Sequence, residues 1–410
     1  MRFFKTFNKA SVETTPEKIE SVLSRGVENI YPNKEFLRVA LLKGDKLTFY
    51  LGIDPTAKTL HVGHSIILLK LKEFQDLGHK VILLIGDFTG MIGDPTDKKA
   101  TRKRLTRSEV LLNSGLYKKQ ISSILSFKGK NPAILKYNST WLSKMNFENV
   151  LDLASRMTVD QMLKRDMFEK RNEEGKPTYI HEFLYPLLQG YDSVAMDVDG
   201  EIGGNDQTFN MLAGRTLMKQ IKNKEKFVVS MKLLTDSSGK KMGKTEGNMV
   251  SLNDRPEEMY GRIMSWGDGM ICPGFELLTN FSEKEIEDIK KVIKDGENPK
   301  NIKMKLAREI VSMYHGKAAA EKAESGFKST FESGAAPDEI KEVFILRGGN
   351  VGHSLKEAGL VASISEWRRL VQEGAVEEVG GKKVLDPKIK AEKDGVFKIG
   401  KKRFVKIVAK

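Results

Sequence analysis

Cysteine is nearly absent from this sequence, because Cys272 is the only one in 410 residues. A single thiol can build neither a disulfide framework nor a cysteine metal site, and such usage is typical of a reducing compartment. We therefore expect a cytoplasmic protein. The longest apolar stretch, residues 81–85, falls far short of the roughly 18 residues that a membrane-spanning helix needs, so we expect no membrane partner.

Acidic residues are missing from the first twelve positions, and Glu13 is the first of them. Residues 1–11 are basic and contain Phe3, Phe4 and Phe7, a composition that transit peptides share. The segment is short and poor in serine, which favours an ordinary N-terminal arm.

Negative charge is outnumbered along the whole chain, which has a formal net charge of +14. Residues 346–410 hold 15 Lys and Arg against 8 Asp and Glu, so half of the excess lies in the last sixth of the chain. A Lys-rich face is common on soluble proteins. The concentration of charge in one C-terminal segment nevertheless favours a nucleic-acid partner.

Strand and helix patterns alternate in the first 250 residues. Residues 47–53 are typical of a strand, residues 65–77 have helical apolar spacing, and the continuous apolar run at 81–85 is typical of a strand covered on both faces. The same order recurs between residues 195 and 235. Parallel strands joined by a helix make a right-handed crossover. We therefore expect an α/β domain with a doubly wound, Rossmann-like parallel sheet over residues 1–250.

Helical patterns dominate from residue 255 onward. Pro256 is typical of a first helical turn, and Ser282 with Glu285 has the spacing of a capping box. We expect a helical domain over residues 251–332. The stretch SGAAP at 333–337 is the best candidate for a linker.

The last part of the chain, residues 345–410, has the pattern of a small, basic α+β domain. Its final stretch contains the alternating apolar residues Phe397, Ile399, Phe404 and Ile407, a pattern typical of strands.

The motif HVGH at residues 61–64 follows a predicted strand and opens a predicted helix. A helix N-terminus offers free N–H groups and partial positive charge, which suit a phosphate. Gly63 allows a nucleotide to come close to the backbone, and His61 and His64 can both donate hydrogen bonds to phosphate oxygens. The plainer interpretation is two surface histidines at a helix cap.

The motif KKMGKT at residues 240–245 is a lysine-rich loop interrupted by glycine. Its lysines can act as point charges on a polyphosphate, and Thr245 adds a hydroxyl donor. On its own, the motif is equally typical of a solvated basic loop.

Together, the two motifs resemble the HIGH and KMSKS signatures of class I aminoacyl-tRNA synthetases in order, spacing and context. Gly243 and Thr245 stand where the general pattern has serines.

Four further segments resemble the tyrosyl-tRNA synthetase family: YLGIDPT at 50–56, TGMIGDP at 89–95, YPLLQGYD at 185–192 and GGNDQ at 203–207. The resemblance extends from about residue 15 to the C-terminus. One departure is Asp97, which stands where the family usually has glycine.

The resemblance implies a role for each of these residues in a tyrosine pocket. A phenol in a pocket needs both a donor and an acceptor, which Tyr50 and Asp192 would supply. Asp94, Tyr185 and Gln189 would bind the substrate ammonium. A plainer reading exists for some of them, because Asp94 before a proline suits a turn, and Tyr50 and Tyr185 suit an apolar core.

The nucleotide contacts are also implied by the resemblance. Gln207 and Asp54 would bracket the substrate carboxylate and the adenylate, and Asp206 would hold the ribose, although Asp206 also suits a helix N-cap. The full implied ATP set is Gly52, Asp54, His61, Gly63, His64, Gly204, Asp206, Lys241, Met242 and Lys244. The residues implied to stabilise the reacting phosphates are Thr56, His61, His64, Lys241, Lys244 and Thr245.

The C-terminal sequences SISEWRRLVQEGAV at 363–376 and GGKKVLD at 380–386 resemble an S4 RNA-binding domain, with Trp367 in place of the usual small residue. Arg368 and Arg369 would pair with RNA phosphates. The residues Lys401, Lys402 and Arg403 would add to the same positive field. A charged solubilising tail is the plainer interpretation.

The family implied by these motifs activates L-tyrosine with ATP and loads it onto tRNA(Tyr). Mg²⁺ would enter with ATP, and we expect no dedicated protein metal site. The family is dimeric through residues around 120–190, so we expect a homodimer.

Three other functions remain open at this point. A tryptophanyl-tRNA synthetase shares the scaffold, but an indole needs only one acceptor. The pairing of Tyr50 with Asp192 therefore disfavours this alternative. An RNA-binding protein on an inactive scaffold is disfavoured by the intact histidine and lysine motifs. A small-molecule nucleotidyltransferase has no use for a basic C-terminal segment.

Overall fold

The structure is a computed structural model that describes residues 12–94, 105–163, 166–235, 249–332, 341–379, 382–400 and 403–410. The chain divides into two compact units. The first comprises Met1–Arg255 with Arg262–Tyr314, and the second comprises Pro256–Gly261 with His315–Lys410. The stretch expected as a helical domain, residues 251–332, is shared between them.

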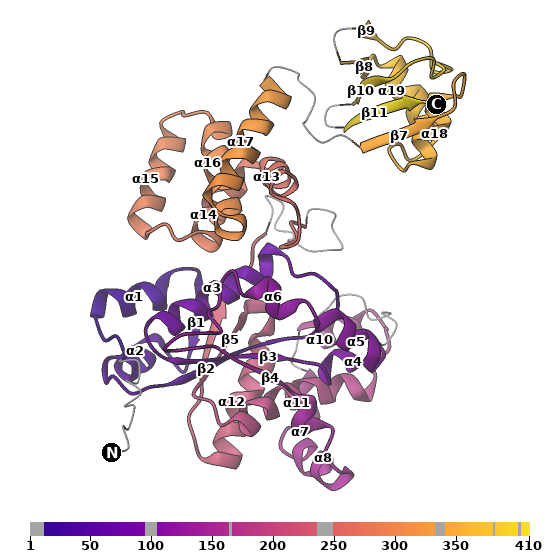
Figure 1. The fold of residues 1–410 in the computed structure, drawn as a ribbon. Coiled ribbons are helices and arrows are strands. Elements are labelled where there is room, and N and C mark those ends of the chain that lie inside the picture. Colours follow the sequence, from indigo (N-terminus) through magenta and orange to yellow (C-terminus); the bar gives the residue numbers. More distant parts are fainter. Residues whose placement is uncertain are drawn as a thin grey trace, which may run out of the picture. The chain divides into compact units, whose positions relative to one another are not determined.

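A six-stranded sheet forms the centre of the first unit (Figure 1). In sheet order the strands are β1 (Val27–Tyr31), β6 (Phe227–Met231), β5 (Gly200–Gly204), β2 (Thr48–Ile53), β3 (Lys80–Ile85) and β4 (Ile134–Tyr137). The last five are parallel, and β1 is antiparallel to β6. The predicted Rossmann-like α/β architecture is confirmed, with one antiparallel edge strand that makes the sheet mixed.

Helices precede β1 and fill the connections between these strands. They are α1 (Pro16–Ser24), α2 (Lys34–Leu42), α3 (Val62–Asp76), α4 (Thr89–Ile92), α5 (Arg107–Ser114), α6 (Tyr117–Ile121), α7 (Ser139–Leu142), α8 (Phe147–Ala154), α9 (Val159–Leu163), α10 (Asp166–Glu173), α11 (Ile180–Met196), the 3₁₀ turn η1 (Asn205–Gln207) and α12 (Thr208–Lys222). In the part of the chain that the structure describes, none of the helices has the length and apolar character needed to cross a membrane.

Both faces of the sheet are covered, as two neighbouring residues of β2 demonstrate. Successive side chains of a strand point to opposite faces. The ring of Phe49 stacks on Phe74 of α3 with a centroid distance of 4.1 Å, whereas the hydroxyl of Tyr50 lies 3.0 Å from Oγ of Ser193 in α11. Helices α3 and α11 therefore cover opposite faces, which explains why the strands are apolar throughout.

Helix α3 begins three residues earlier than the apolar spacing predicts, at Val62, because His61 acts as its N-cap. It ends where the sequence predicts. Gly78 adopts φ of +92°, a left-handed conformation that glycine accepts without strain and that commonly terminates helices.

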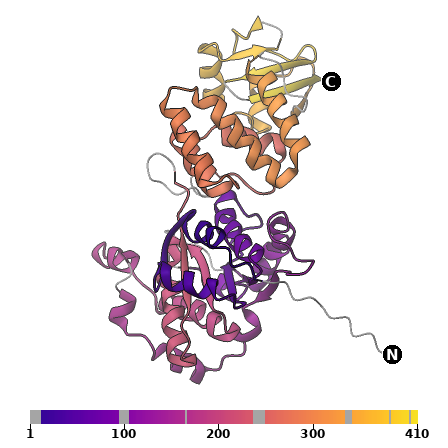
Figure 2. The ribbon, with the colours of Figure 1, turned by 90° about the vertical axis from the view of Figure 1, so that its left-hand side faces the viewer.

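The first unit also contains the helices α14 (Ile271–Leu278), α15 (Glu283–Lys294) and α16 (Pro299–His315), preceded by the 3₁₀ turn η3 (Asp268–Met270). Figure 2 shows them from a second direction. The capping box predicted at Ser282 and Glu285 is present at the start of α15. Helix α13 (Pro256–Met264) belongs partly to each unit.

The second unit contains α17 (Lys317–Glu332) and a small α+β fold. Its five strands, in sheet order, are β7 (Lys341–Ile345), β11 (Arg403–Ala409), β10 (Gly395–Ile399), β8 (Val376–Glu378) and β9 (Lys382–Lys383). Among the described residues of this sheet, β7 and β11 are the one pair that runs parallel, and the other neighbouring strands pair antiparallel. The helices α18 (Val351–Glu357) and α19 (Ile364–Gln372) pack on this sheet.

Trp367 explains how this small fold tolerates a large residue in α19. Its ring is buried in the core, and its Nε1 donates to the carbonyl of Pro387 at 2.7 Å. Gly352 leaves the space, because an added Cβ there would lie 2.4 Å from the indole. In β11, Val405 and Ile407 are the buried residues, whereas Phe404 has the opposite parity and is only half-buried, so Phe404 does not share a face with Ile407 as the predicted alternation implied.

Candidate active site

The carboxyl ends of β2, β3 and β5 meet at one edge of the sheet, where open α/β sheets bind their ligands. Asp54 follows β2 directly. Its Oδ1 accepts a hydrogen bond from Oγ1 of Thr89 at 2.6 Å, and its Oδ2 accepts one from the hydroxyl of Tyr185 at 2.8 Å. Gly86 follows β3, and a Cβ there would lie 1.9 Å from Oδ1 of Asp54. Glycine at position 86 is therefore what admits this carboxylate.

Burial raises the pKa of Asp54 to about 7, and the neighbouring carboxylates of Asp94 and Asp87 act in the same direction. The two hydroxyl donors favour the anion and oppose this rise. Burial also raises the pKa of Tyr185 well above its usual range, so its hydroxyl keeps its proton and donates. The strand edge therefore contains a carboxyl group that titrates near neutral pH.

The two motif histidines cap the helix that they begin. Nδ1 of His61 accepts from the backbone N–H of Gly63 at 3.1 Å, and Nδ1 of His64 accepts from the backbone N–H of His61 at 3.2 Å. Because Nδ1 accepts, the neutral rings carry their proton on Nε2 as a donor. The ring centroids are 3.9 Å apart. A Cβ at Gly63 would lie 2.9 Å from the His61 ring, so glycine allows this cap to form.

The segment that follows the lysine-rich loop lies against the same helix start. The backbone N–H of Val62 donates to the carbonyl of Val250 at 3.0 Å, and that of Leu252 donates to the carbonyl of Leu60 at 2.9 Å. The end of the loop is thus anchored beside the histidines. The residues Lys241, Met242, Lys244 and Thr245 themselves lie outside the described residues.

The two residues expected to bind a phenol lie where α11 covers the sheet, Tyr50 in β2 and Asp192 in α11. Tyr50 is fully buried, and burial raises the pKa of its hydroxyl well above the usual range. Asp192 is held by two donors, Nε1 of Trp141 at 2.7 Å and Nδ2 of Asn138 at 3.2 Å. Burial raises the pKa of Asp192, while these two donors favour its charged form.

Two of the residues expected around the substrate ammonium, Asp94 and Gln189, belong to one series of hydrogen-bonded side chains, whereas Tyr185 donates to Asp54 instead. Nε2 of Gln207 donates to Oδ2 of Asp94 at 2.6 Å. Nδ2 of Asn210 donates to the carbonyl oxygens of both Gln207 and Gln189, each at 3.0 Å. Nε2 of Gln189 donates to Oε1 of Glu201 at 3.0 Å. Asp94 and Gln189 are therefore linked through Gln207, which the sequence analysis selected, and Asn210, which it did not.

The remaining predicted contacts lie at the strand ends. Gly52 in β2 and Thr56 after it are exposed. Gly204 ends β5, where a Cβ would lie 2.5 Å from Oδ1 of Asp206 and 3.0 Å from Leu233, so glycine keeps this turn open.

Six residues of the site were missed by the sequence analysis: Asn138, Trp141, Ser193, Asn210, Glu201 and Lys226. A signal for the last two was present, because each is a charged residue inside or next to an apolar strand. A charge that is buried by its strand requires a partner. No comparable signal marks the other four.

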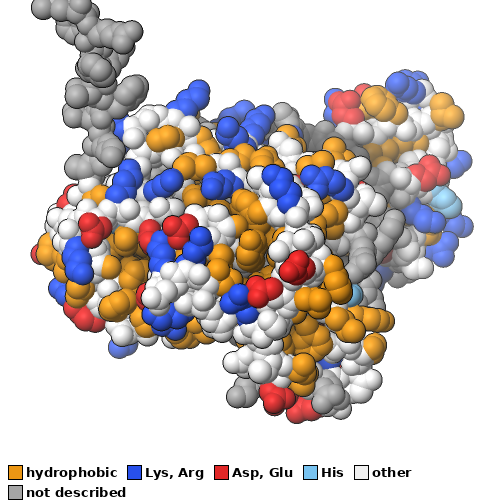
Figure 3. Space-filling view, turned by 90° about the horizontal axis from the view of Figure 1, so that it is seen from below, with side chains coloured by type: hydrophobic (Ala, Val, Ile, Leu, Met, Phe, Trp, Pro, Cys, Tyr) orange, Lys and Arg blue, Asp and Glu red, His pale blue; other side chains and the backbone are white. Residues whose placement is uncertain are grey.

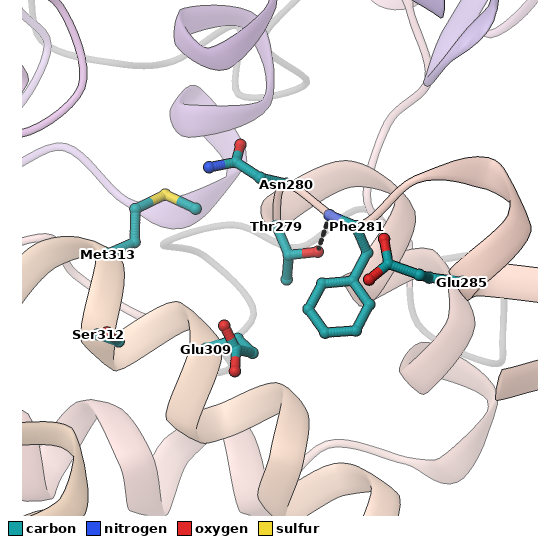
Figure 4. Close-up of a pocket in the computed structure, with 7 residues that line it drawn as sticks. All are labelled: Thr279, Asn280, Phe281, Glu285, Glu309, Ser312 and Met313. Atoms are coloured by element: carbon teal, nitrogen blue, oxygen red, sulfur yellow. Dashed lines mark hydrogen bonds between the residues drawn. The ribbon is translucent and has the colours of Figure 1, made fainter. Parts of the chain in front are cut away.

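A pocket of about 320 Å³ lies elsewhere in the first unit, between α16 and the turn before α15 (Figure 4). Its lining residues are Thr279, Asn280, Phe281, Glu285, Glu309, Ser312 and Met313. None of the predicted site residues is among them. Within the described ranges, no group of three His, Cys, Asp or Glu side chains is arranged to hold a metal ion.

The basic residues of the second unit differ in their surroundings. Arg368 and Arg369 on α19 are exposed. Arg403 donates to the carbonyl of Leu360 at 2.6 Å and to Glu366 at 2.9 Å, so its guanidinium is partly engaged within the fold. Lys401 and Lys402 lie outside the described residues.

Comparison with known proteins identifies the family. The family model described as tRNA synthetases class I (W and Y) matches residues 42–332. The chain belongs to this family. The synthetase is 45% identical to a tyrosine–tRNA ligase 2 of Vibrio cholerae, with 98% of this chain and 100% of the relative covered. It is 44% identical to a tyrosine–tRNA ligase of Photobacterium profundum, with 96% and 99% covered.

Solved structures agree with this family. The synthetase resembles a C-terminally truncated mitochondrial tyrosyl-tRNA synthetase of Coccidioides posadasii with a TM-score of 0.61 and 25% identity, covering 76% of this chain and 94% of that one. An Archaeoglobus fulgidus tyrosyl-tRNA synthetase complexed with L-tyrosine shares the fold, with a TM-score of 0.59 and 21% identity over 75% of this chain and 99% of that one.

Proposed function

We infer that this synthetase is a tyrosine–tRNA ligase. It activates L-tyrosine with ATP to give tyrosyl-adenylate and pyrophosphate, and then transfers tyrosine to the 3′ end of tRNA(Tyr). The observation that carries the amino-acid assignment is the buried carboxylate of Asp192, held by Trp141 and Asn138 on the sheet face where Tyr50 also lies. A hydrogen-bonding group fixed by two donors in a buried pocket favours a hydroxyl-bearing ring over a plain one, because a buried polar group left unpaired is costly.

The two ends of the amino acid would meet different groups. Asp192 accepts the hydrogen of the substrate phenol and Tyr50 donates to its oxygen. Asp94, Tyr185 and Gln189 bind the ammonium, and Gln207 faces the carboxylate. Two observations support this division: Asp94 and Gln189 are linked through Gln207 and Asn210, and the hydroxyl of Tyr185 donates to Asp54.

In the first step, a carboxylate oxygen of tyrosine attacks the α-phosphorus of ATP. A carboxyl-oxygen–phosphorus bond forms, the bond to the bridging oxygen breaks, and pyrophosphate leaves. The protein needs no nucleophile of its own, so catalysis consists of positioning and charge stabilisation. The residues assigned to this stabilisation are Thr56, His61 and His64 on one side, and Lys241, Lys244 and Thr245 on the other.

The nucleotide would lie along the edge of the sheet formed by the carboxyl ends of β2, β3 and β5. Asp206 would hold the ribose, and Gly52, Gly63 and Gly204 would allow close backbone approach, with Asp54 and Met242 completing the adenosine and phosphate contacts. Mg²⁺ would arrive bound to ATP and balance the charge of its phosphates. The Nε2–H groups of His61 and His64 support this assignment, since they are donors at a helix N-terminus.

The second step requires contacts with tRNA. We assign them to the helical region 251–332, on the anticodon side of the tRNA, and to an S4-like domain at 345–410. The exposed positions of Arg368 and Arg369 support the latter.

A homodimer is the assembly that this surface favours. Large apolar side chains are exposed on α8 and at the start of α11: Phe147 is 76% exposed, Leu151 54% and Ile180 81%. Figure 3 shows the molecule from below the view of Figure 1, where α8 is drawn. Hydrophobic side chains form patches on that face. Exposed apolar patches of this kind are typical of protein interfaces.

The test is ATP–pyrophosphate exchange with purified protein, supplied with each of the twenty amino acids in turn. Exchange driven by tyrosine alone is the expected result. Exchange driven by tryptophan would overturn the pocket assignment while keeping the scaffold. The absence of exchange with every amino acid would refute the activity and favour an RNA-binding protein on an inactive scaffold.

A further inference from the structure

A buried ion pair lies directly beneath the residues assigned to tyrosine. Lys226 is fully buried, and its ammonium contacts the Glu201 carboxylate, whose side chain is 3% exposed. The ammonium also donates to Oγ of Ser193 at 2.8 Å and to the carbonyl of Met211 at 3.2 Å. Its three hydrogens therefore each have an acceptor, which is the full capacity of a lysine.

The crossing of α11 and α12 is shaped to accommodate this ammonium. A Cβ at Gly214 of α12 would lie 2.5 Å from Nζ of Lys226, 3.1 Å from Oγ of Ser193 and 3.2 Å from Cα of Gly190. Glycine at position 214 thus leaves the room that the charge occupies. A buried ion pair of this kind contributes little to stability compared with apolar residues of the same size. Its presence calls for a functional reason.

The reason lies in the direction of the hydrogen bonds that leave the pair. A carboxylate only accepts, so the amide of Gln189 must turn its NH₂ group toward Glu201 and its carbonyl oxygen away from it. At the other end of the chain, the carboxylate of Asp94 turns Gln207 in the same sense. Nδ2 of Asn210 then uses its two hydrogens on the two outward carbonyl oxygens. Each of the three amides between Glu201 and Asp94 therefore has one orientation, because the carboxylate at either end of this hydrogen-bonded series can only accept.

The same pair reaches the opposite end of the pocket. Ser193, which accepts from Lys226, lies 3.0 Å from the hydroxyl of Tyr50, and Nζ of Lys226 lies 5.7 Å from the centroid of the Tyr50 ring. The ion pair therefore contacts residues at both ends of the pocket. Glu201 contacts Gln189 directly, and Lys226 reaches Tyr50 through Ser193.

We propose that the Lys226–Glu201 pair positions the tyrosine pocket. Glu201 fixes Gln189 with its carbonyl oxygen available to the substrate ammonium, and Lys226 neutralises Glu201 while holding Ser193 against Tyr50. Glu201 and Lys226 are positioning residues, which act through Gln189 and Tyr50. This inference rests on the proposed activation of tyrosine.

The variant E201Q inverts the arrangement without changing its size. The ammonium of Lys226 can only donate, so it attracts the carbonyl oxygen of the new glutamine, whose NH₂ group then faces Gln189. Gln189 must turn its own carbonyl inward and present NH₂ to the substrate ammonium, which repels it. In the double variant E201Q/K226M this constraint is absent, and Gln189 is free to adopt either orientation.

Three ligands distinguish positioning from general damage to the pocket: L-tyrosine, tyramine, which keeps the amine, and 3-(4-hydroxyphenyl)propanoate, which lacks it. Tyrosine KM in pyrophosphate exchange and the inhibition constants of the two analogues are measured. We expect E201Q to raise the tyrosine and tyramine constants together by about 10- to 150-fold, the range of one hydrogen bond to a charge. The constant for the deaminated analogue and the KM for ATP should stay within about twofold. The double variant should lie between E201Q and the natural chain.

The matched control is E182Q, which also removes one carboxylate from a buried ion pair, that with Arg171 at 2.8 Å. It should leave all three ligand constants unchanged. Equal weakening of the three ligands by E201Q, or no change in tyrosine KM, would overturn the proposal, as would a double variant as impaired as E201Q. Failure of the natural chain to exchange with tyrosine would refute the proposed function instead, so the two failures are distinguishable.

Discussion

Replacement of Asp192 by asparagine is the most direct test of how this synthetase recognises the substrate ring. The carboxylate accepts from Trp141 at 2.7 Å and from Asn138 at 3.2 Å. An asparagine can keep its oxygen toward Trp141, but its NH₂ group then faces the NH₂ group of Asn138. That NH₂ group cannot accept a hydrogen bond from the substrate hydroxyl, as the carboxylate oxygen does. A hydrogen bond to a charged group contributes about 1.5–3 kcal/mol.

The loss expected in kcat/KM for tyrosine is therefore about 10- to 150-fold. Phenylalanine has no hydroxyl, so its kcat/KM should change by less than about twofold, and the tyrosine-to-phenylalanine ratio should fall by the same factor as tyrosine alone. Pyrophosphate exchange with each amino acid measures both values. The control Asp76→Asn removes an exposed carboxylate that pairs with Lys72 at the end of α3, and should leave the ratio unchanged. An unaltered ratio in Asp192→Asn would refute the assignment of this carboxylate to the phenol.

Three other predictions concern protonation, packing and RNA. Because the folded pKa of Asp54 is raised to about 7, its contribution to stability is present at low pH and is lost as the pH rises through 7. The difference in Tm, that of the Asp54→Asn variant minus that of the natural chain, should therefore increase between pH 5 and 8. A Tm difference that stays constant over this range would contradict the raised pKa of Asp54. Gly214→Ala places a Cβ 2.5 Å from the ammonium of Lys226 and should destabilise the fold by about 1–3 kcal/mol, seen as a lower Tm. Replacement of Arg368 and Arg369 by alanine should weaken tRNA binding and reduce its salt dependence by about one phosphate contact per arginine, with pyrophosphate exchange unchanged.

Two controls accompany these variants. Gly326→Ala in α17 meets no neighbouring atom within 4 Å and should raise stability slightly, because alanine favours the helix. Lys144→Ala removes an exposed positive charge from the first unit and should leave tRNA binding unchanged. Equal effects from these controls would contradict the reasoning for the Gly214 and arginine variants.

The sequence predicts the order of elements well where local rules operate. The helix that opens at HVGH, its stop at Gly78 and the capping box at Ser282 depend on a few neighbouring residues, and all three are present. The alternation of strand and helix predicts the parallel sheet for the same reason. The antiparallel pairing of β1 with β6 was not predicted, because it joins segments about 200 residues apart and no local pattern encodes it.

The sequence by itself determined which residues contact the substrates under our proposal, since the motifs mark Tyr50, Asp192, His61 and His64 by type and spacing. Only the tertiary structure decided how these residues are held. Asn138 and Trp141 lie together at α7 and Lys226 lies in another segment, and these residues acquire their roles through hydrogen bonds that form when the chain folds. The orientation of Gln189 likewise depends on a carboxylate twelve residues away that faces it across the packed interior. Hydrogen bonds in a buried site depend on distance and direction in space, and these are properties of the fold rather than of any single segment.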